Sequence, residues 1–134
     1  MWGLLGGFIA WVLTNLIAHP LHRFISLRSE AARLLALYED RFDVTNPEAP
    51  RPPEDWLAER RRAYDTFGAD LTGFAFSNSI FTRMLHRLRP KRFRCYPRNA
   101  GSAFVALSQA APGTSADNET RQSIMRYLKL RYRP

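Results

Sequence analysis

The sequence predicts an all-α protein, in which an N-terminal transmembrane helix precedes a small cytoplasmic helical bundle. Three observations support this fold class. Residues 2–18 carry no charged side chain, the chain after them repeats apolar residues at helical spacing, and no window alternates strongly enough to indicate a strand. With 134 residues, the chain has room for about one domain.

The uncharged segment WGLLGGFIAWVLTNLIA is near the minimum length that crosses the hydrocarbon core of a bilayer. A core helix would alternate apolar and polar faces, whereas this segment is apolar all round. A signal peptide would have a basic residue before the apolar run and small residues at its cleavage site, and the match to both features is poor. We therefore predict an uncleaved anchor over 1–19. A core or interfacial helix and a signal peptide are the alternatives.

The charges that flank this anchor predict its orientation. Arg23, Arg28 and Arg33 all follow it, and no charged side chain precedes it. Because basic residues are retained on the cytoplasmic side, we expect the N-terminus outside and the helical domain, 20–134, in the cytoplasm. The single cysteine, Cys95, agrees with a reducing compartment and excludes an intramolecular disulfide.

Small residues recur along the anchor at four-residue spacing, which lets two helix backbones approach closely. A polar residue, Asn15, could hydrogen-bond across such an interface. We predict that the anchor associates with itself or with a partner helix, although small residues are also common in membrane helices by chance. The predicted contact residues are Gly3, Gly6, Gly7, Ala10, Thr14 and Asn15.

The rest of the chain divides into helices. The pattern becomes amphipathic after Pro20, so the first helix either continues with a bend there or starts afresh. The proline-rich segment near 45–53 ends it and is the main linker. A second helix is predicted to begin near Glu54 and to weaken at 76–79, and a further apolar stretch continues to Pro90.

Two more helices are predicted in the last third of the chain. Asn99 is expected to cap a helix that ends at Gln109. Asp117 or Asn118 is expected to cap a last helix that ends at Leu130, after the turn APGTSADNE.

The net charge of +8 is unevenly spread, since no acidic residue occurs between Leu71 and Ala116. Such a basic block faces an anionic surface, lipid or nucleic acid, or is simply a solvated face. Interleaved aromatic rings suit both kinds of contact. We favour anionic lipid headgroups, because the anchor holds the block near the leaflet. The predicted contact residues are Arg87, Arg89, Lys91, Arg92, Phe93, Arg94, Tyr96 and Arg98.

Enzyme motifs do not emerge from the sequence. It contains no Gly-rich phosphate loop, no two-histidine zinc helix and no serine elbow. His19 and His22 have a spacing that could hold a metal, but no third ligand type clusters nearby. We therefore expect a non-enzymatic protein with no catalytic residue, no metal site and no cofactor.

The segments NLIAHPLHRFISLRSEAARLLALYED, AYDTFGADLTGFAFSNS, AGSAFVALSQA and RQSIMRYLKL follow one another in this order. Together they resemble a widespread family of small uncharacterised bacterial single-pass membrane proteins with a cytoplasmic helical domain. The likeness covers most of the chain, although RFRCYPRN stands where that set tends to carry GYD. It implies a fold and a topology in the bacterial inner membrane, and no activity.

A looser analogy of architecture adds a functional expectation, because similarly built small proteins serve as accessory membrane pores in RNA-targeting CRISPR defence systems. We predict a protein that self-associates through its anchor and helical domain, as a structural or pore-forming homo-oligomer and an accessory of a defence system. The alternatives are an anchoring subunit of a larger membrane complex and a membrane-tethered nucleic-acid binder.

Overall fold

The computed structural model describes residues 2–38, 47–48, 50–87 and 94–130. Every regular element within these residues is helical, which confirms the all-α prediction for this part of the chain. The elements are α1 (Trp2–Leu13), a π-helical segment η1 (Thr14–Ala18), α2 (His19–Leu37), α3 (Glu54–Ser77), α4 (Ser79–His86), α5 (Pro97–Gln109) and α6 (Ser115–Leu128).

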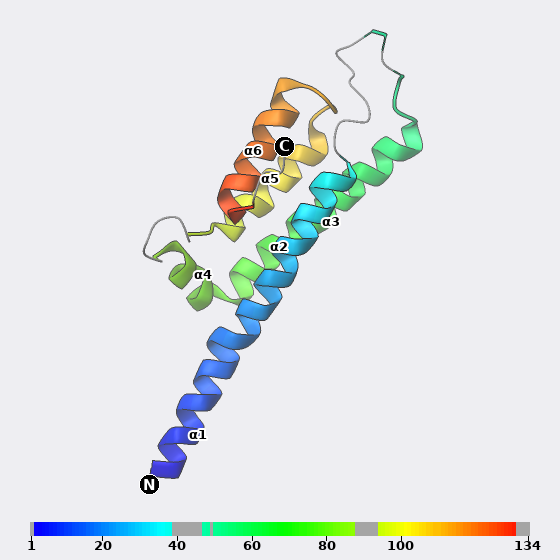
Figure 1. The fold of residues 1–134 in the computed structure, drawn as a ribbon. Coiled ribbons are helices and arrows are strands. Elements are labelled where there is room, and N and C mark those ends of the chain that lie inside the picture. Colours follow the sequence, from blue (N-terminus) through cyan, green and yellow to red (C-terminus); the bar gives the residue numbers. More distant parts are fainter. Residues whose placement is uncertain (1, 39–46, 49, 88–93, 131–134) are drawn as a thin grey trace.

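The first three elements form one continuous helix from Trp2 to Leu37 (Figure 1). The helix therefore neither ends nor starts afresh at Pro20. Proline lacks an N–H group, and its ring crowds the carbonyl four residues earlier. The helix widens immediately before Pro20, where the His19 N–H donates to the carbonyl of Thr14, five residues earlier. This wider turn makes room for the ring and lets the helix run on.

The remaining helices form a bundle at one end of this long helix. In Figure 1, α2 runs away from the N-terminus, α3 returns, α4 turns sideways, and α5 and α6 form a hairpin. Aromatic side chains fill the core: the Phe24 ring lies 6.0 Å from that of Phe74, and the Phe67 ring lies 4.8 Å from that of Phe104. The core therefore joins α2 and α5 through α3, whose aromatic side chains contact both helices.

Helices α3 and α5 approach each other most closely at two glycines. A Cβ atom added to Gly68 would lie 2.8 Å from the Gly101 carbonyl oxygen. A Cβ atom added to Gly101 would lie 2.9 Å from the Gly68 carbonyl oxygen. No side chain fits at either position, so the two backbones are in direct contact there.

The predicted helix boundaries hold best where a local breaker sets them. Helix α3 begins at Glu54 as predicted, and residues 76–79 contain the predicted break, where α3 ends at Ser77 and α4 begins at Ser79. Of the predicted linker, residues 47, 48 and 50–53 lie outside helices, and 45, 46 and 49 are outside the described residues.

The predicted caps of the last two helices are wrong. Thr114 caps α6, since its hydroxyl oxygen accepts from the Asp117 N–H at 3.3 Å. Asp117 instead points its carboxylate into the protein. Helix α6 ends at Leu128, because Lys129 adopts the left-handed conformation with φ of 52°. Helix α5 begins at Pro97, whose fixed φ suits the first helical position, and not at Asn99.

Candidate functional site

Helix α1 lies entirely outside the bundle and buries none of its residues (Figure 1). Its large apolar side chains are exposed on every side, from Trp2 (89% exposed) and Leu4 (82%) to Leu13 (51%). Water is a poor solvent for such a surface, whereas hydrocarbon suits it. The helix Trp2–Leu37 is long and apolar enough to span a membrane.

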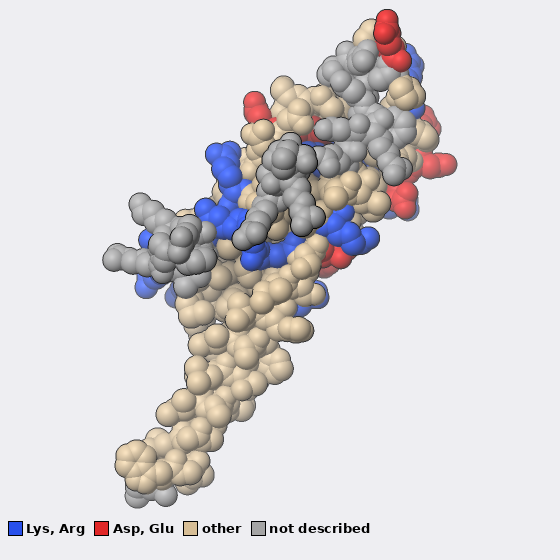
Figure 2. All heavy atoms as spheres, in the orientation of Figure 1, with Lys and Arg blue, Asp and Glu red and all other residues tan. Residues whose placement is uncertain are grey.

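Charged residues are segregated along the long axis of the molecule. Figure 2 shows an uncharged rod, then Lys and Arg side chains gathered mainly over the adjoining part of the bundle, then acidic side chains toward the opposite end. The acid-free stretch explains this order, since it supplies about the last two turns of α3, α4 and the start of α5, which all lie on the side of α1 (Figure 1). The end of the bundle next to α1 is therefore basic.

The structure places four of the eight predicted basic-contact residues, and the other four (Arg89, Lys91, Arg92 and Phe93) are outside the described residues. Arg87 is exposed at the end of α4, and Arg94 is half-buried. The Tyr96 N–H donates to the Tyr127 carbonyl at 2.8 Å, and its ring lies 4.9 Å from that of His86. The half-buried Tyr96 ring thus packs against the His86 ring of α4. The guanidinium of Arg98 lies over the Phe76 ring, 4.9 Å from its centre.

The predicted helix-contact residues lie together on the long helix, most of them on the part that the bundle leaves uncovered, whereas Asn15 lines a small cavity that α4 also borders. A Cβ atom on any of the three N-terminal glycines would meet nothing within 4 Å, and Ala10 is exposed. The Thr14 hydroxyl donates to the Ala10 carbonyl at 2.8 Å, and the Asn15 amide nitrogen donates to the Trp11 carbonyl at 2.9 Å. These bonds satisfy the Thr14 hydroxyl donor and one of the two N–H donors of the Asn15 amide within the helix, which lowers the cost of placing them in hydrocarbon.

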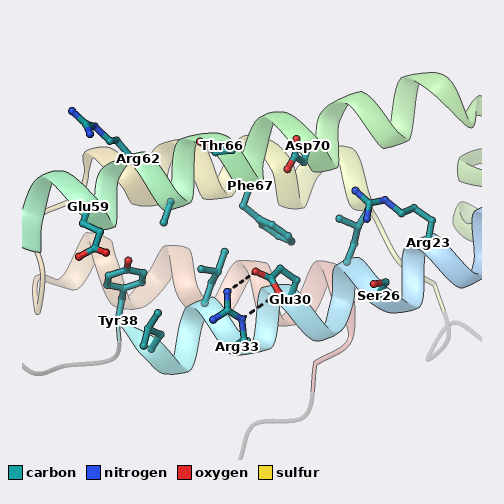
Figure 3. Close-up of a pocket in the computed structure, with 14 residues that line it drawn as sticks. Arg23, Ser26, Glu30, Arg33, Tyr38, Glu59, Arg62, Thr66, Phe67 and Asp70 are labelled. Atoms are coloured by element: carbon teal, nitrogen blue, oxygen red, sulfur yellow. Dashed lines mark hydrogen bonds and ion pairs between the residues drawn. The ribbon is translucent and has the colours of Figure 1, made fainter.

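A surface groove of about 730 Å³ lies between α2 and α3 (Figure 3). Charged side chains of both signs line it, and two of them, Glu30 and Arg33, pair with each other at 2.7 Å. Leu34 and Phe67 contribute apolar surface. Among the described residues of the whole chain, no three His, Cys, Asp or Glu side chains gather as metal ligands would. We assign no reaction to this groove.

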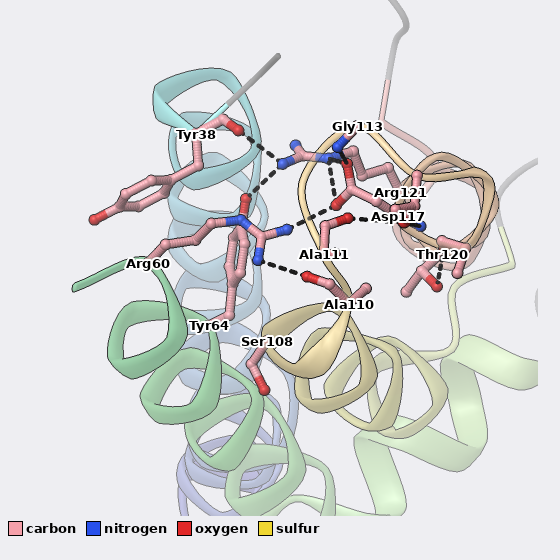
Figure 4. Close-up of polar contacts among 12 residues, drawn as sticks. Tyr38, Arg60, Tyr64, Ser108, Ala110, Ala111, Gly113, Asp117, Thr120 and Arg121 are labelled. Atoms are coloured by element: carbon pink, nitrogen blue, oxygen red, sulfur yellow. Dashed lines mark hydrogen bonds and ion pairs between the residues drawn. The ribbon is translucent and has the colours of Figure 1, made fainter. Parts of the chain in front are cut away.

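A buried ionic network at the end of the bundle away from the anchor was missed by the sequence analysis (Figure 4). Asp117 is 1% exposed and Arg60 is 2% exposed, and their side chains pair at 2.7 Å. Arg121 approaches the same carboxylate at 3.2 Å and also donates to the Tyr64 hydroxyl at 3.0 Å. Burial lowers the pKa of Arg60 and raises the pKa of Tyr64.

Further donors of the two arginines bind backbone carbonyls, whereas the buried Nε atom of Arg60 has no hydrogen-bond partner among the described residues. Arg121 donates to the Leu35 and Tyr38 carbonyls at the end of α2, at 3.0 and 2.8 Å, and Arg60 donates to the Ala110 carbonyl at 3.0 Å. The network therefore ties together α2, α3, the α5–α6 turn and α6. Because its groups bond one another inside the protein, we interpret it as structural.

One signal in the sequence could have identified Arg60 as buried. It lies three residues after Leu57 and four before Tyr64, which places it on the apolar stripe of its helix. Arg121, four residues after Asp117, is a further signal, since residues at this spacing share a helix face.

Comparisons with known proteins give no relative: no family model, no curated protein and no solved structure matches this chain. The resemblance to small bacterial membrane proteins therefore stays a prediction.

Proposed function

We propose that this chain is a non-enzymatic membrane protein, which anchors its helical bundle through α1 and self-associates through the same helix into a structural or pore-forming assembly. The observation that carries the proposal is α1 itself. It is apolar, exposed all round, and joined to the bundle at its basic end. The link to a defence system stays a prediction.

The length of the apolar surface supports a membrane span. Seventeen helical residues measure about 25 Å, slightly less than the hydrocarbon core of about 30 Å. The continuous helix extends this surface, because the next exposed apolar side chains after Ala18 are Leu21 (42% exposed) and Ile25 (51%). Arg23 lies between them, and its long side chain can reach the headgroups from there.

The proposed orientation predicts a clear reporter result. A reporter that is active only in the periplasm, fused after Pro134, should stay silent in a bacterial host, because the basic end of the bundle is retained on the cytoplasmic side. A second reporter that is active only in the cytoplasm, fused at the same position, should be active. The opposite pair of signals would reverse the orientation.

The proposed self-association predicts the effect of a larger side chain in the small-residue rows. Ala10→Leu should push the helix backbones apart and reduce crosslinked oligomers several-fold in native membranes, because contacts of this kind contribute about 1 kcal/mol each. Insertion should persist, since leucine is at least as apolar as alanine. The control is Leu5→Ala, on the opposite face of the helix from the rows, which should leave assembly intact.

The crosslinking pattern also separates the alternatives. A ladder at multiples of 15.5 kDa indicates self-association, whereas a single heavier band indicates a partner subunit. RNA that copurifies and is lost steeply with salt would indicate a nucleic-acid binder. If Ala10→Leu crosslinks like the parent, the small-residue rows are not the contact.

A further inference from the structure

Helix α4 has one face in the bundle and one face outside it. Phe81 and Leu85 are buried, and the Phe81 ring lies 6.1 Å from that of Phe24. On the opposite face, Ile80 (62% exposed) and Met84 (37%) lie one turn apart. The exposed residues Arg83 and Arg87 share that face, at the same spacing. We call these four exposed residues the α4 surface.

The α4 surface lies at the level of the anchor. Ile80 lines a small cavity of about 90 Å³ together with Leu16 and Pro20 of the long helix. Leu16 belongs to the uncharged segment, seven residues before Arg23, which is about 10 Å along a helix. Ile80 is therefore level with the last turn of the anchor, on the apolar side of the first arginine of the chain.

The direction of α4 is fixed by its connection to α3. Asn78 breaks the helical path with φ of −119° and ψ of 50°. The Thr82 hydroxyl then donates to the Ala75 carbonyl at 3.2 Å, and the Thr82 N–H donates to the Asn78 carbonyl at 2.9 Å. These bonds hold α4 sideways to the line of the anchor (Figure 1). If α1 crosses a bilayer, α4 lies parallel to the bilayer plane.

The composition of this region matches the boundary between lipid tails and headgroups. Apolar side chains alternate with arginines on the exposed face, as in helices that lie in a membrane interface. Phe76, one turn before α4, is 62% exposed and carries the Arg98 guanidinium on its ring. Lipid phosphates complement these arginines, since the sequence has no acidic residue from 71 to 116.

We propose that α4 is a second membrane contact, which rests on anionic lipid headgroups with Ile80 and Met84 inserted at the top of the acyl chains and Arg83 and Arg87 on phosphates. This inference rests on the proposed function, because it requires α1 to span the bilayer. The second contact would fix the height and the tilt of the bundle relative to the membrane, since one helix crosses the membrane and another lies on its surface.

Spin labels on the full chain in vesicles test the inference. In a Cys95→Ala background, single cysteines replace Ile9 in the anchor, Ile80 on α4, and the exposed Gln122 on α6. The vesicles contain phosphatidylcholine and phosphatidylglycerol. The rates at which each spin label collides with dissolved oxygen and with a water-soluble nickel chelate report how deep that label lies in the membrane. We expect the label at 9 deep in hydrocarbon, the label at 80 at the base of the headgroups, and the label at 122 in water.

The outcomes separate the two proposals. If the label at 80 meets the nickel chelate as often as the label at 122, while the label at 9 is deep, α4 does not touch lipid and only this inference fails. If the label at 9 is also in water, the proposed span fails and this inference fails with it. Spin–spin broadening at 80 that disappears on dilution with unlabelled chain would place a second copy there and overturn lipid as the occupant.

The charged part of the contact has its own test. In vesicles of phosphatidylcholine alone, collisions of the label at 80 with the nickel chelate should increase several-fold, while the label at 9 stays unchanged. Arg83→Gln combined with Arg87→Gln should produce the same increase in the mixed vesicles. An unchanged label at 80 in both experiments would overturn the assignment of these arginines to lipid phosphates.

Discussion

Asp117→Asn is expected to lower the free energy of unfolding of the bundle by about 3–5 kcal/mol, the usual cost of removing one partner from a buried ion pair. Asp117 is the acidic partner of both Arg60 and Arg121 in the buried network. Without its charge, two buried guanidinium groups would share a site with no compensating carboxylate. Domains are stable by about 5–15 kcal/mol, so this loss would be a large share of the total stability.

The geometry leaves asparagine no favourable arrangement. The carboxylate accepts hydrogen bonds from the Arg60 Nη2 atom at 2.7 Å, from Arg121 Nε at 3.2 Å and from the Gly113 N–H at 3.3 Å. Asparagine has one acceptor oxygen, and its NH₂ group would face a donor at the other position. Burial already lowers the pKa of Arg60, and Asp117 is one of the groups that oppose this shift.

A matched control is available on the surface. Glu30→Gln makes the same change from acid to amide in the Glu30–Arg33 pair, whose side chains are 43% and 63% exposed. It should leave the free energy of unfolding unchanged, since solvent screens exposed pairs. Urea titration of the full chain in mild detergent, followed by far-ultraviolet circular dichroism, measures both variants. Equal losses in the two variants would contradict the role assigned to the network.

The parts of the fold that the sequence predicted are those with local signals. Prolines before Glu54 and the polar residues at 77–79 interrupt an apolar stripe, and both marked real helix ends. The caps failed because several polar residues precede α6, and only the path of the chain decides which one caps it. Whether Pro20 ends a helix depends on whether the turn before it can widen, which the residue types alone do not determine.

The features of the candidate site also divide into those with a local sequence signal and those without one. An uncharged segment and a basic block are properties of the linear sequence, so the exposed apolar helix and the adjoining basic end of the bundle were both predicted. The buried network and the α4 surface depend on tertiary placement. Arg60 is the first of three consecutive arginines, and the packing of α3 selects it for burial. Ile80 is a candidate lipid contact because it lies next to Leu16, which is sixty-four positions away in the chain.

Gly68→Ala is expected to destabilise the bundle by about 2 kcal/mol, through overpacking at the closest approach of α3 and α5. The new methyl carbon would lie 2.8 Å from the Gly101 carbonyl oxygen and 2.9 Å from Val105 Cγ2. The Val105 side chain can change its rotamer, but the carbonyl belongs to the backbone of α5. The whole helix must therefore move. Such a shift would also loosen the contact between the Phe67 and Phe104 rings.

The matched control lies on the same helix, at Gly73, where an added Cβ atom meets nothing within 4 Å. Alanine favours a helix interior over glycine by about 1 kcal/mol, so Gly73→Ala should stabilise the bundle by up to that amount. Gly68→Ala receives the same gain, and the steric cost must therefore exceed it. The two substitutions should shift the urea midpoint of the full chain in opposite directions. A shift of the same sign for both would mean that α3 and α5 have room to separate, and that their contact is not set by backbone approach at these glycines.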